Sequence, residues 1–334
     1  MASVSIRLAR KALVALKLEA TRGTWETLAT ADTYEVTDLS WPTLSAEQIS
    51  WNTLRNTLTK DPDAVKIGNL TGAITFTTAI PLATAASPAA TTFNTKLGQL
   101  FEACGTDSDL SSVTTSVTPA DNSTSSLSMS FNADGMEIRM RGCVGSFKLI
   151  LNAGEFARVE WTFQGVIDDV LESAALAITS IVSITPEKVE SMGTFTLTPA
   201  AGTAALACVA SSELECGAET TAYKCMAGDK GIGFFFNSDR VSTLSLVTGP
   251  MYSAADAQLD DELYDAFENS TLVTVQCSHN VTWADPGLRY TFIGTISDLQ
   301  LAELDGSVRW NITISGAAAA AEGEFLIEYE SAPA

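Results

Sequence analysis

The residues best able to do chemistry in this sequence are few and scattered. His279 is the only histidine and lies in VQCSHNVTW, so a Ser-His-Asp or Cys-His arrangement is possible by composition alone. Neither a G-x-S-x-G nucleophile turn nor a glycine-rich phosphate loop accompanies it. Residues 61–63, DPD, lack the further oxygen ligands of a calcium loop. We therefore expect no enzyme, no catalytic residue, and no bound metal or cofactor.

The cysteines give no metal-site signal either. Six occur, at Cys104, Cys143, Cys208, Cys216, Cys225 and Cys277. No two of them form a C-x-x-C pair, so the spacing of a zinc site is absent. In a protein made in the cytosol we expect reduced, partly buried thiols. Bridges among the three central cysteines after release into an oxidising medium are the alternative, because spacing alone does not decide geometry.

The chain is strongly acidic, and its charge is unevenly distributed. Its 334 residues carry 19 basic and 40 acidic side chains, a net charge of −21. Residues 1–167 carry 13 basic and 16 acidic side chains, a net charge of −3, whereas residues 168–334 carry 6 and 24, a net charge of −18. Such a charge disfavours nonspecific attraction to nucleic acid or to an anionic membrane. A solubility device is the simplest interpretation.

The N-terminus, MASVSIRLARKALVALKLEA, has a basic start and a short apolar patch. Lys17 and Glu19 interrupt the apolar run too early for a signal peptide. No uninterrupted apolar run of about 20 residues could span a bilayer. We therefore expect synthesis in the cytosol and no membrane contact. Residues 4–19 fit a helix or a strand, and the basic cluster Arg7, Arg10 and Lys11 would suit an arm that reaches an acidic surface.

Alternation of apolar and polar residues predicts a mainly β chain. VGSFKLILNAGEFARVEWTFQG, residues 144–165, predicts a β-hairpin. Residues 64–80 predict a strand pair or one long bent strand, punctuated by glycine. Residues 33–60 predict a long connection flanked by strands, and long connections are uncommon without a purpose.

Two segments have helical spacing, and the remaining pattern is again that of strands. Residues 91–105 predict a helix ended by Gly105, and residues 257–270 predict a second, short helix. Residues 106–131 predict exposed strands and a loop. The final EFLIEYE, residues 324–330, can add as an edge strand to its own sheet or to a neighbour's.

The strongest pattern recurs about 150 residues later. MEIRMRGCVGSFKL, residues 136–149, aligns with LRYTFIGTISDLQL, residues 288–301, with two identical positions in 14. With a shortened turn, the alignment places three apolar or glycine pairs together: Gly142 with Gly294, Phe147 with Leu299, and Trp161 with Trp310. Both halves also place one helix upstream of this block, so we interpret the pattern as a duplication with a boundary near residue 180. Chance similarity between alternating strands is the alternative.

Three stretches resemble one family, the major tail tube proteins of long-tailed bacteriophages. They are LVALKLEATRGT (13–24), LGQLFEACG (97–105) and, most specifically, ADGMEIRMRGCVGSFKLILNAGEFARVEWTFQG (133–165). They cover the first half of the chain, whereas the second half is similar only in pattern.

The resemblance implies a mainly β fold with short helices, made of two tandem tail-tube-type domains of the β-sandwich or half-barrel kind that form part of a ring-shaped β-barrel. Residues 1–180 would be the first domain, with an N-terminal arm and a long stacking loop, and residues 181–334 the second, with a C-terminal strand. By position the stacking loop is 41–66, and its contact candidates are Trp41, Trp51 and Arg55. The alternative is that both tryptophans fill their own core.

The implied function is structural, in the virion. Copies would form a homotrimeric pseudo-hexameric ring, or a homohexamer, and the rings would stack into a tail tube made in the host bacterial cytoplasm. Further partners would be the tape measure, tail terminator, and distal tail or baseplate proteins. Genomic DNA would pass through the lumen without specific binding, since an acidic wall offers phosphates no cation.

Two other functions remain open at the level of sequence. A carbohydrate-binding β-sandwich, as in adhesins or lectins, would use exposed tryptophans and stay small in solution. A distal tail or terminator protein would form a single ring and not stack.

Overall fold

The computed structural model describes residues 12–50, 65–80, 97–110, 114–120, 124–172, 189, 195–199, 204–206, 209–225, 232–248, 263–278, 287–304, 306–317 and 323–330. Across these residues the protein is mainly β with short helices, as the sequence predicts. One hydrogen-bonded sheet system contains 17 strands, and two further strands pair only with each other. No part of this described sheet closes into a barrel within the single chain.

Seven strands from the first half of the chain form one antiparallel series. They are β1 (Ala12–Leu18), β2 (Thr33–Tyr34), β3 (Thr43–Ser50), β4 (Val65–Ala79), β7 (Leu127–Ala133), β8 (Met136–Asn152) and β9 (Arg158–Glu172). Their spatial order is β3-β4-β9-β8-β7-β1-β2. The long hairpin β8–β9 forms the centre of this series.

Seven strands from the second half repeat that order. They are β10 (Phe195–Pro199), β11 (Ala204–Leu206), β12 (Val209–Glu215), β15 (Thr243–Thr248), β16 (Leu272–Ser278), β17 (Gly287–Leu304) and β18 (Ser307–Gly316). Their spatial order is β12-β15-β18-β17-β16-β10-β11, again antiparallel throughout. Each of the six pairings therefore has a counterpart between strands at the same place in the other half.

The remaining elements stand between or beside these series. They are a 3-10 turn η2 (Thr30–Asp32), helix α2 (Gln99–Glu102), helical residues 263–268, β5 (Thr106–Leu110), β6 (Thr114–Pro119), β19 (Phe325–Glu330) and the separate hairpin β13 (Ala218–Lys224) with β14 (Ile232–Arg240). Helix α2 lies between β4 and β7 in sequence, and residues 263–268 lie between β15 and β16. The helices therefore also occupy equivalent places.

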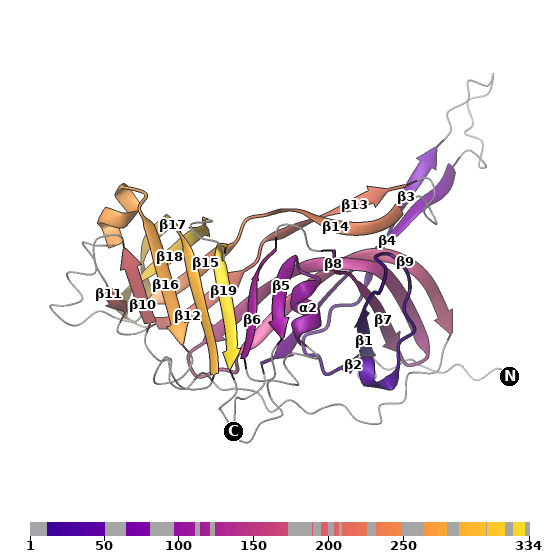
Figure 1. The fold of residues 1–334 in the computed structure, drawn as a ribbon, viewed down its shortest axis with the longest axis horizontal. Coiled ribbons are helices and arrows are strands. Elements are labelled where there is room, and N and C mark those ends of the chain that lie inside the picture. The colour runs from indigo at the N-terminus through magenta and orange to yellow at the C-terminus, as the bar shows by residue number, and fades with distance from the viewer. Residues whose placement is uncertain are drawn as a thin grey trace.

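Two sets of strand pairs join the halves (Figure 1). The end of β8 pairs with β12, from Lys148 with Glu215 to Asn152 with Ser211. The C-terminal β19 lies between β17 and β6, so a strand of the first half extends a sheet of the second. In Figure 1, β5, β6 and α2 lie between the two strand groups, and hairpin β13–β14 runs across the top toward β3 and β4.

The core is continuous through the first half and into the second. Trp161 is fully buried and packs edge-on against Phe101 of α2, with ring centroids 4.8 Å apart. Phe147 packs against the same Phe101 at 4.8 Å and against Phe325 of β19 at 5.8 Å. Because buried aromatic rings supply the largest apolar areas, this cluster anchors the helix and the C-terminal strand to the β8–β9 hairpin.

Most of the predicted elements are present, with differences in detail. Residues 64–80 contain one strand, β4, and residues 33–60 contain strand β3 where a connection was expected. The helix predicted for 91–105 is described from residue 97 and ends before Gly105, whose φ of 79° is easily adopted only by glycine. The predicted helix 257–270 is described over 263–268.

Two predictions about exposure are wrong. Within 106–131, residues 127–131 of β7 are all buried, and β7 is an interior strand between β1 and β8. The hydroxyls of Ser128 and Ser130 donate to the carboxylates of Glu19 and Glu137. The C-terminal strand is interior to its own sheet and has two neighbours, so it is not an edge strand.

The sequence alignment of the two hairpins is wrong in register. Gly142 has a φ of 59° in an irregular stretch of the β8 ladder, whereas Gly294 pairs directly with Gly316. A side chain on Gly294 would meet a β18 carbonyl at 2.1 Å, and one on Gly145 would meet a β9 carbonyl at 2.1 Å. Gly294 therefore corresponds to Gly145, and shifts of this kind escape sequence alignment because alternating strands match at many offsets.

The partners of the remaining alignment residues shift accordingly. In the first hairpin, Trp161 pairs with Phe147. The equivalent pair in the second hairpin is Ile314 with Ile296, so Ile314 occupies the place of Trp161. Trp310 pairs instead with Leu301, beyond a bulge that precedes Leu299. Trp161 and Trp310 thus do not occupy equivalent places, although each lies in the second strand of its hairpin.

Candidate assembly surface

One continuous ladder of strands connects the two halves and presents a polar face. The order β4-β9-β8-β12-β15-β18-β17 follows from successive pairings. One face carries buried apolar side chains of the core. The opposite face, called here the polar face, is defined by Thr75, Ser146, Lys148, Arg158, Glu160, Thr162, Glu213, Glu215, Thr243, Ser245, Thr295, Asp298, Thr313 and Ser315.

Small hydroxyl side chains and carboxylates predominate on the polar face. A single cross-strand row runs from Glu160 through Lys148 and Glu215 to three hydroxyl residues, Thr243, Ser315 and Thr295. Four carboxylates oppose two cations among the fourteen defining residues. The face is therefore acidic and mainly hydrophilic, with Ile150 and Val247 as apolar residues among the polar ones.

Both cations of the polar face lie beside carboxylates. Lys148 Nζ lies 2.5 Å from Glu213 Oε2 across the β8–β12 junction. The hydrogen bond to Glu213 raises the pKa of Lys148, with Glu215 and Glu160 adding to the effect. Arg158 Nη1 lies 3.6 Å from Glu155 Oε2. Each cation is therefore already matched to an anion of the same chain.

Hairpin β13–β14 crosses one end of the polar face. Ile232 and Phe235 form a small buried cluster with Val144 and Val166 of β8 and β9. Ala218 N donates to Ser146 Oγ at 3.2 Å. The hairpin comes close to the first half because glycines face it. A Cβ on Gly142 would lie 3.0 Å from the side chain of Phe234, and a Cβ on Gly23 would lie 2.7 Å from the carbonyl oxygen of Gly233. Its far end lies beside β3, where Lys224 Nζ is 3.5 Å from Glu47 Oε2.

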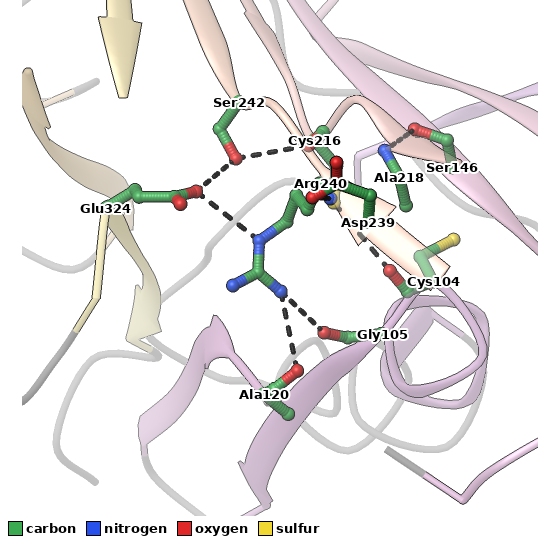
Figure 2. A network of polar contacts seen from close by, with 10 residues as sticks. All are labelled: Cys104, Gly105, Ala120, Ser146, Cys216, Ala218, Asp239, Arg240, Ser242 and Glu324. Carbon is green, nitrogen blue, oxygen red and sulfur yellow. Dashed lines mark hydrogen bonds and ion pairs between the residues drawn. The ribbon is translucent and has the colours of Figure 1, made fainter. Parts of the chain in front are cut away.

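A cavity of about 670 Å³ opens where six stretches of the two halves meet. Arg240, at the end of β14, lines it, and Figure 2 shows the polar contacts of its guanidinium. Its Nε lies 3.3 Å from Glu324 Oε2, and its Nη1 donates to the carbonyls of Gly105 at 3.2 Å and Ala120 at 3.4 Å. Glu324 also accepts from Ser242 Oγ at 2.6 Å. The guanidinium therefore joins the turn after α2, the end of β6 and the start of β19.

The thiols beside this network are unsuited to nucleophilic work. Cys216 Sγ donates weakly to the carbonyl of Cys104 at 3.7 Å, and both side chains are buried. Burial raises the pKa of Cys216 to about 12 and that of Cys104 well above its ordinary value. Because the thiolate is the reactive form, these cysteines act as packing residues. Cys104, Cys143, Cys216, Cys225 and Cys277 are all free thiols in the described structure.

The predicted contact candidates are described only in part. Trp41 is 51% exposed, and its ring lies edge-on to Phe131 at 5.2 Å, so it neither fills the core nor stands fully free. Trp51, Arg55 and His279 lie outside the described residues. The six alignment candidates lie in the two hairpins, where Phe147 and Trp161 are core residues and Leu299 and Trp310 pack partly against the core.

Sequence inspection missed Arg240, Glu324 and Glu19. The carboxylate of Glu19 accepts from Gly142 N at 2.7 Å and from Gly23 N at 2.6 Å, so it holds the turn against which β13–β14 packs. These residues carry no local motif, since their partners are distant in sequence. A lone arginine at a strand end is the only signal, and it is too common to be informative.

Comparison with protein families and curated proteins identifies no relative. No protein-family model matches the chain, and no curated protein matches it significantly. Within the described residues, no cluster of histidine, cysteine or carboxylate side chains has the arrangement of a metal site. No helix in the described part of the chain is long and apolar enough to cross a membrane.

Proposed function

We propose that this protein is a structural virion protein whose copies form stacked rings of a bacteriophage tail tube, the conduit for DNA ejection. In this proposal residues 1–180 and 181–334 are two tandem tail-tube-type domains, and three chains supply the six units of each ring. The host bacterial cytoplasm is the site of synthesis and the tail of the virion is the final location.

The observation that carries the proposal is the repeated strand order joined by one ladder. The order β3-β4-β9-β8-β7-β1-β2 recurs as β12-β15-β18-β17-β16-β10-β11, and the β8–β12 pairing connects the two. A unit that pairs edge to edge with its copy can continue around a rotation axis until the ring closes. Closure also removes sheet edges that would otherwise aggregate.

The polar face supports an inner wall more than an outer one. Double-stranded DNA binds proteins chiefly through phosphates neutralised by lysine and arginine, with release of counterions. Lys148 and Arg158 are each beside a carboxylate, and small hydroxyls occupy most other positions of this face. A duplex moving along such a wall finds no unmatched cation to hold it.

The projecting hairpins support stacking. Hairpins β3–β4 and β13–β14 both extend beyond the main sheets (Figure 1). Their ends lie together, joined by the Lys224–Glu47 pair. Two adjacent extensions from one chain are suited to reach a neighbouring ring, which agrees with the role expected for residues 41–66.

Electron microscopy of the purified full-length protein at high concentration tests the proposal. Hollow stacked rings with threefold symmetry and six lobes are the expected result. Sixfold rings would retain the tube and reject the two-units-per-chain arrangement, whereas single rings that never stack would favour a terminator or distal tail protein. Small particles at every concentration, with or without a tail initiator complex, would reject the tube. Binding to a glycan array would then support the carbohydrate-binding alternative.

A further inference from the structure

The junction inside the chain buries two leucines, and one of their two counterparts in β17 is exposed. Leu149 and Leu151 in β8 are each 1% exposed, and β12 pairs alongside them, with Leu214 opposite Leu149 and Ser212 opposite Leu151. Their counterparts follow from the hairpin registers. Leu149 pairs with Val159 and Leu299 pairs with Ile312, which occupy equivalent places in β9 and β18.

The equivalent leucine in β17 is open to solvent. Leu301 corresponds to Leu151 and is 62% exposed, and Val308 beside it is 63% exposed. On the edge of β17 that faces away from β18, strand β16 pairs only as far as Thr295. From residue 296 to 304, no described strand pairs with that edge. An unpaired edge with exposed apolar side chains is a strong association surface.

The strand that would cover this edge can be located by the same correspondence. In the second half, Glu213 of β12 pairs with Ser245, which in turn pairs with Thr313. In the first half, Thr37 pairs with Thr77, which in turn pairs with Glu160. Since Thr313 and Glu160 are equivalent, Thr37 is the counterpart of Glu213. Within residues 36–41, the described ladder contacts run only toward β4, through Thr37 and Ser40. Residues Thr37, Asp38, Ser40 and Trp41 are exposed.

We propose that residues 36–41 of a second copy of this chain pair with residues 296–301 of β17, antiparallel, and place Thr37 opposite Gln300. This arrangement repeats the internal junction, in which Glu213 lies opposite Ile150. The second copy covers Leu301 as β12 covers Leu151. The inference rests on the proposed ring assembly and names the lateral contact that closes it. It also assigns Trp41 to the contact within a ring instead of the contact between rings.

The contact is head to tail, because the two surfaces are different. A heterologous contact closes into a ring when its rotation is a simple fraction of a turn, and otherwise gives an open helix. If the contact between chains repeats the rotation between the halves of one chain, each chain adds two steps. With a step of one-sixth of a turn, three such chains make a closed ring of six repeats.

Disulfide trapping in the full-length chain tests the register. Thr37→Cys and Gln300→Cys are introduced together, with Cys208 and Cys225 replaced by serine. Directly opposite strand residues have Cα atoms about 4.5–5.5 Å apart, within the range of a disulfide. The control pairs Thr37→Cys with Glu303→Cys, about 10 Å further along the strand and out of reach. Rings are counted by electron microscopy before and after oxidation.

For the variant with cysteines at positions 37 and 300, oxidation is expected to give covalent dimers and trimers and nothing larger. The control is expected to give at least tenfold less cross-linked protein. Rings that form but cross-link better in the control, or in neither variant, overturn the register and leave the tube proposal standing. Covalent trimer rings that never stack support the contact and reject the tube. Protein that stays monomeric and uncross-linked at all concentrations rejects both.

Discussion

Arg240 and Glu324 form an ion pair, 3.3 Å from Nε to Oε2, between residues that are 84 positions apart in sequence (Figure 2). Their side chains are only 17% and 16% exposed. The pair joins β14, which packs on the first half, to the segment that precedes β19. It is therefore one of the polar contacts that hold the two halves and the C-terminal strand together.

Replacing Arg240 by methionine is expected to destabilise the protein by about 3 kcal/mol, because Glu324 is left as an unpaired, largely buried carboxylate. The carbonyls of Gly105 and Ala120 also lose their donor. Urea unfolding followed by fluorescence measures the change. Lys224→Met is the matched control, since its pair with Glu47 is exposed on both sides and such pairs contribute little. Equal losses in the two variants would contradict the assignment.

The two tryptophans that align in sequence are expected to behave differently on substitution. Trp161 is fully buried, and its Nε1 donates to Thr78 Oγ1 at 2.8 Å, so Trp161→Ala should cost about 3–5 kcal/mol. Trp310 is only partly buried in the same chain, so Trp310→Ala should cost clearly less. Thermal denaturation of both variants measures this. Similar losses would instead support equivalent positions for the two rings.

This difference illustrates how far the sequence could predict the fold. Alternation along residues 144–165 identifies the hairpin, because strand side chains point alternately to the two faces. It does not identify the register, since Trp161 and Trp310 align equally well whether or not they are equivalent. The register is decided by close approaches such as that of Gly145 to a β9 carbonyl, which exist only after the strands have paired.

The candidate surface was less predictable than the fold. That Lys148 lies between Glu160 and Glu215 depends on β12 pairing with β8, more than 60 residues away in sequence. The same holds for Arg240, whose partners come from three separate segments. Local patterns carry no information about such pairings. The excess of acidic residues was visible in the composition, but the placement of Glu160, Glu213, Glu215 and Asp298 on one face of the sheet was not.

Stability is expected to fall above pH 9 because of the buried thiols. Burial raises the pKa of Cys277 to about 12 from an ordinary value of 9.0, so the folded state keeps the thiol protonated where the unfolded state ionises. The stabilising contribution is therefore complete below about pH 9 and is lost as the pH rises toward 12. Each such thiol costs about 1.4 kcal/mol per pH unit in this window.

Urea unfolding of Cys277→Ala at pH 8 and pH 10 tests this contribution. At pH 8 the variant should have a lower free energy of unfolding than the parent. From pH 8 to pH 10, however, its free energy of unfolding should fall by about 1.4 kcal/mol less than that of the parent. Val273→Ala, a buried substitution on the same strand without a titrating group, should lower stability equally at both. A pH dependence identical in parent and Cys277→Ala would show that this thiol does not contribute.

Leu301→Glu is expected to block ring formation while leaving the monomer folded. Leu301 is already exposed in the single chain, so the folded monomer has little to lose, but a contact that buries it would bury a charge. Each contact should weaken by more than about tenfold, corresponding to 1.4 kcal/mol. Sedimentation measures assembly and circular dichroism measures folding. Val241→Glu, at an equally exposed valine away from this edge, is the control and should assemble normally.

Neutralising carboxylates of the polar face is expected to slow DNA passage without preventing assembly. In a variant with Glu160→Gln, Glu213→Gln and Glu215→Gln, the ammonium of Lys148 loses the anions now beside it and becomes available to phosphates. Release of DNA from particles carrying this variant should be slower by roughly tenfold at low ionic strength, and less so at high salt.

Two companion variants isolate the cause. Adding Lys148→Gln to the triple variant should restore release, because the freed cation is then absent. Substituting three carboxylates elsewhere, at Glu172, Asp265 and Glu268, changes the net charge equally and should leave release unchanged, since these exposed residues lie outside the polar face. Normal release by the triple variant in fully assembled tubes would mean that the polar face does not line the path of the DNA. Slow release in the distant variant as well would point to net charge alone.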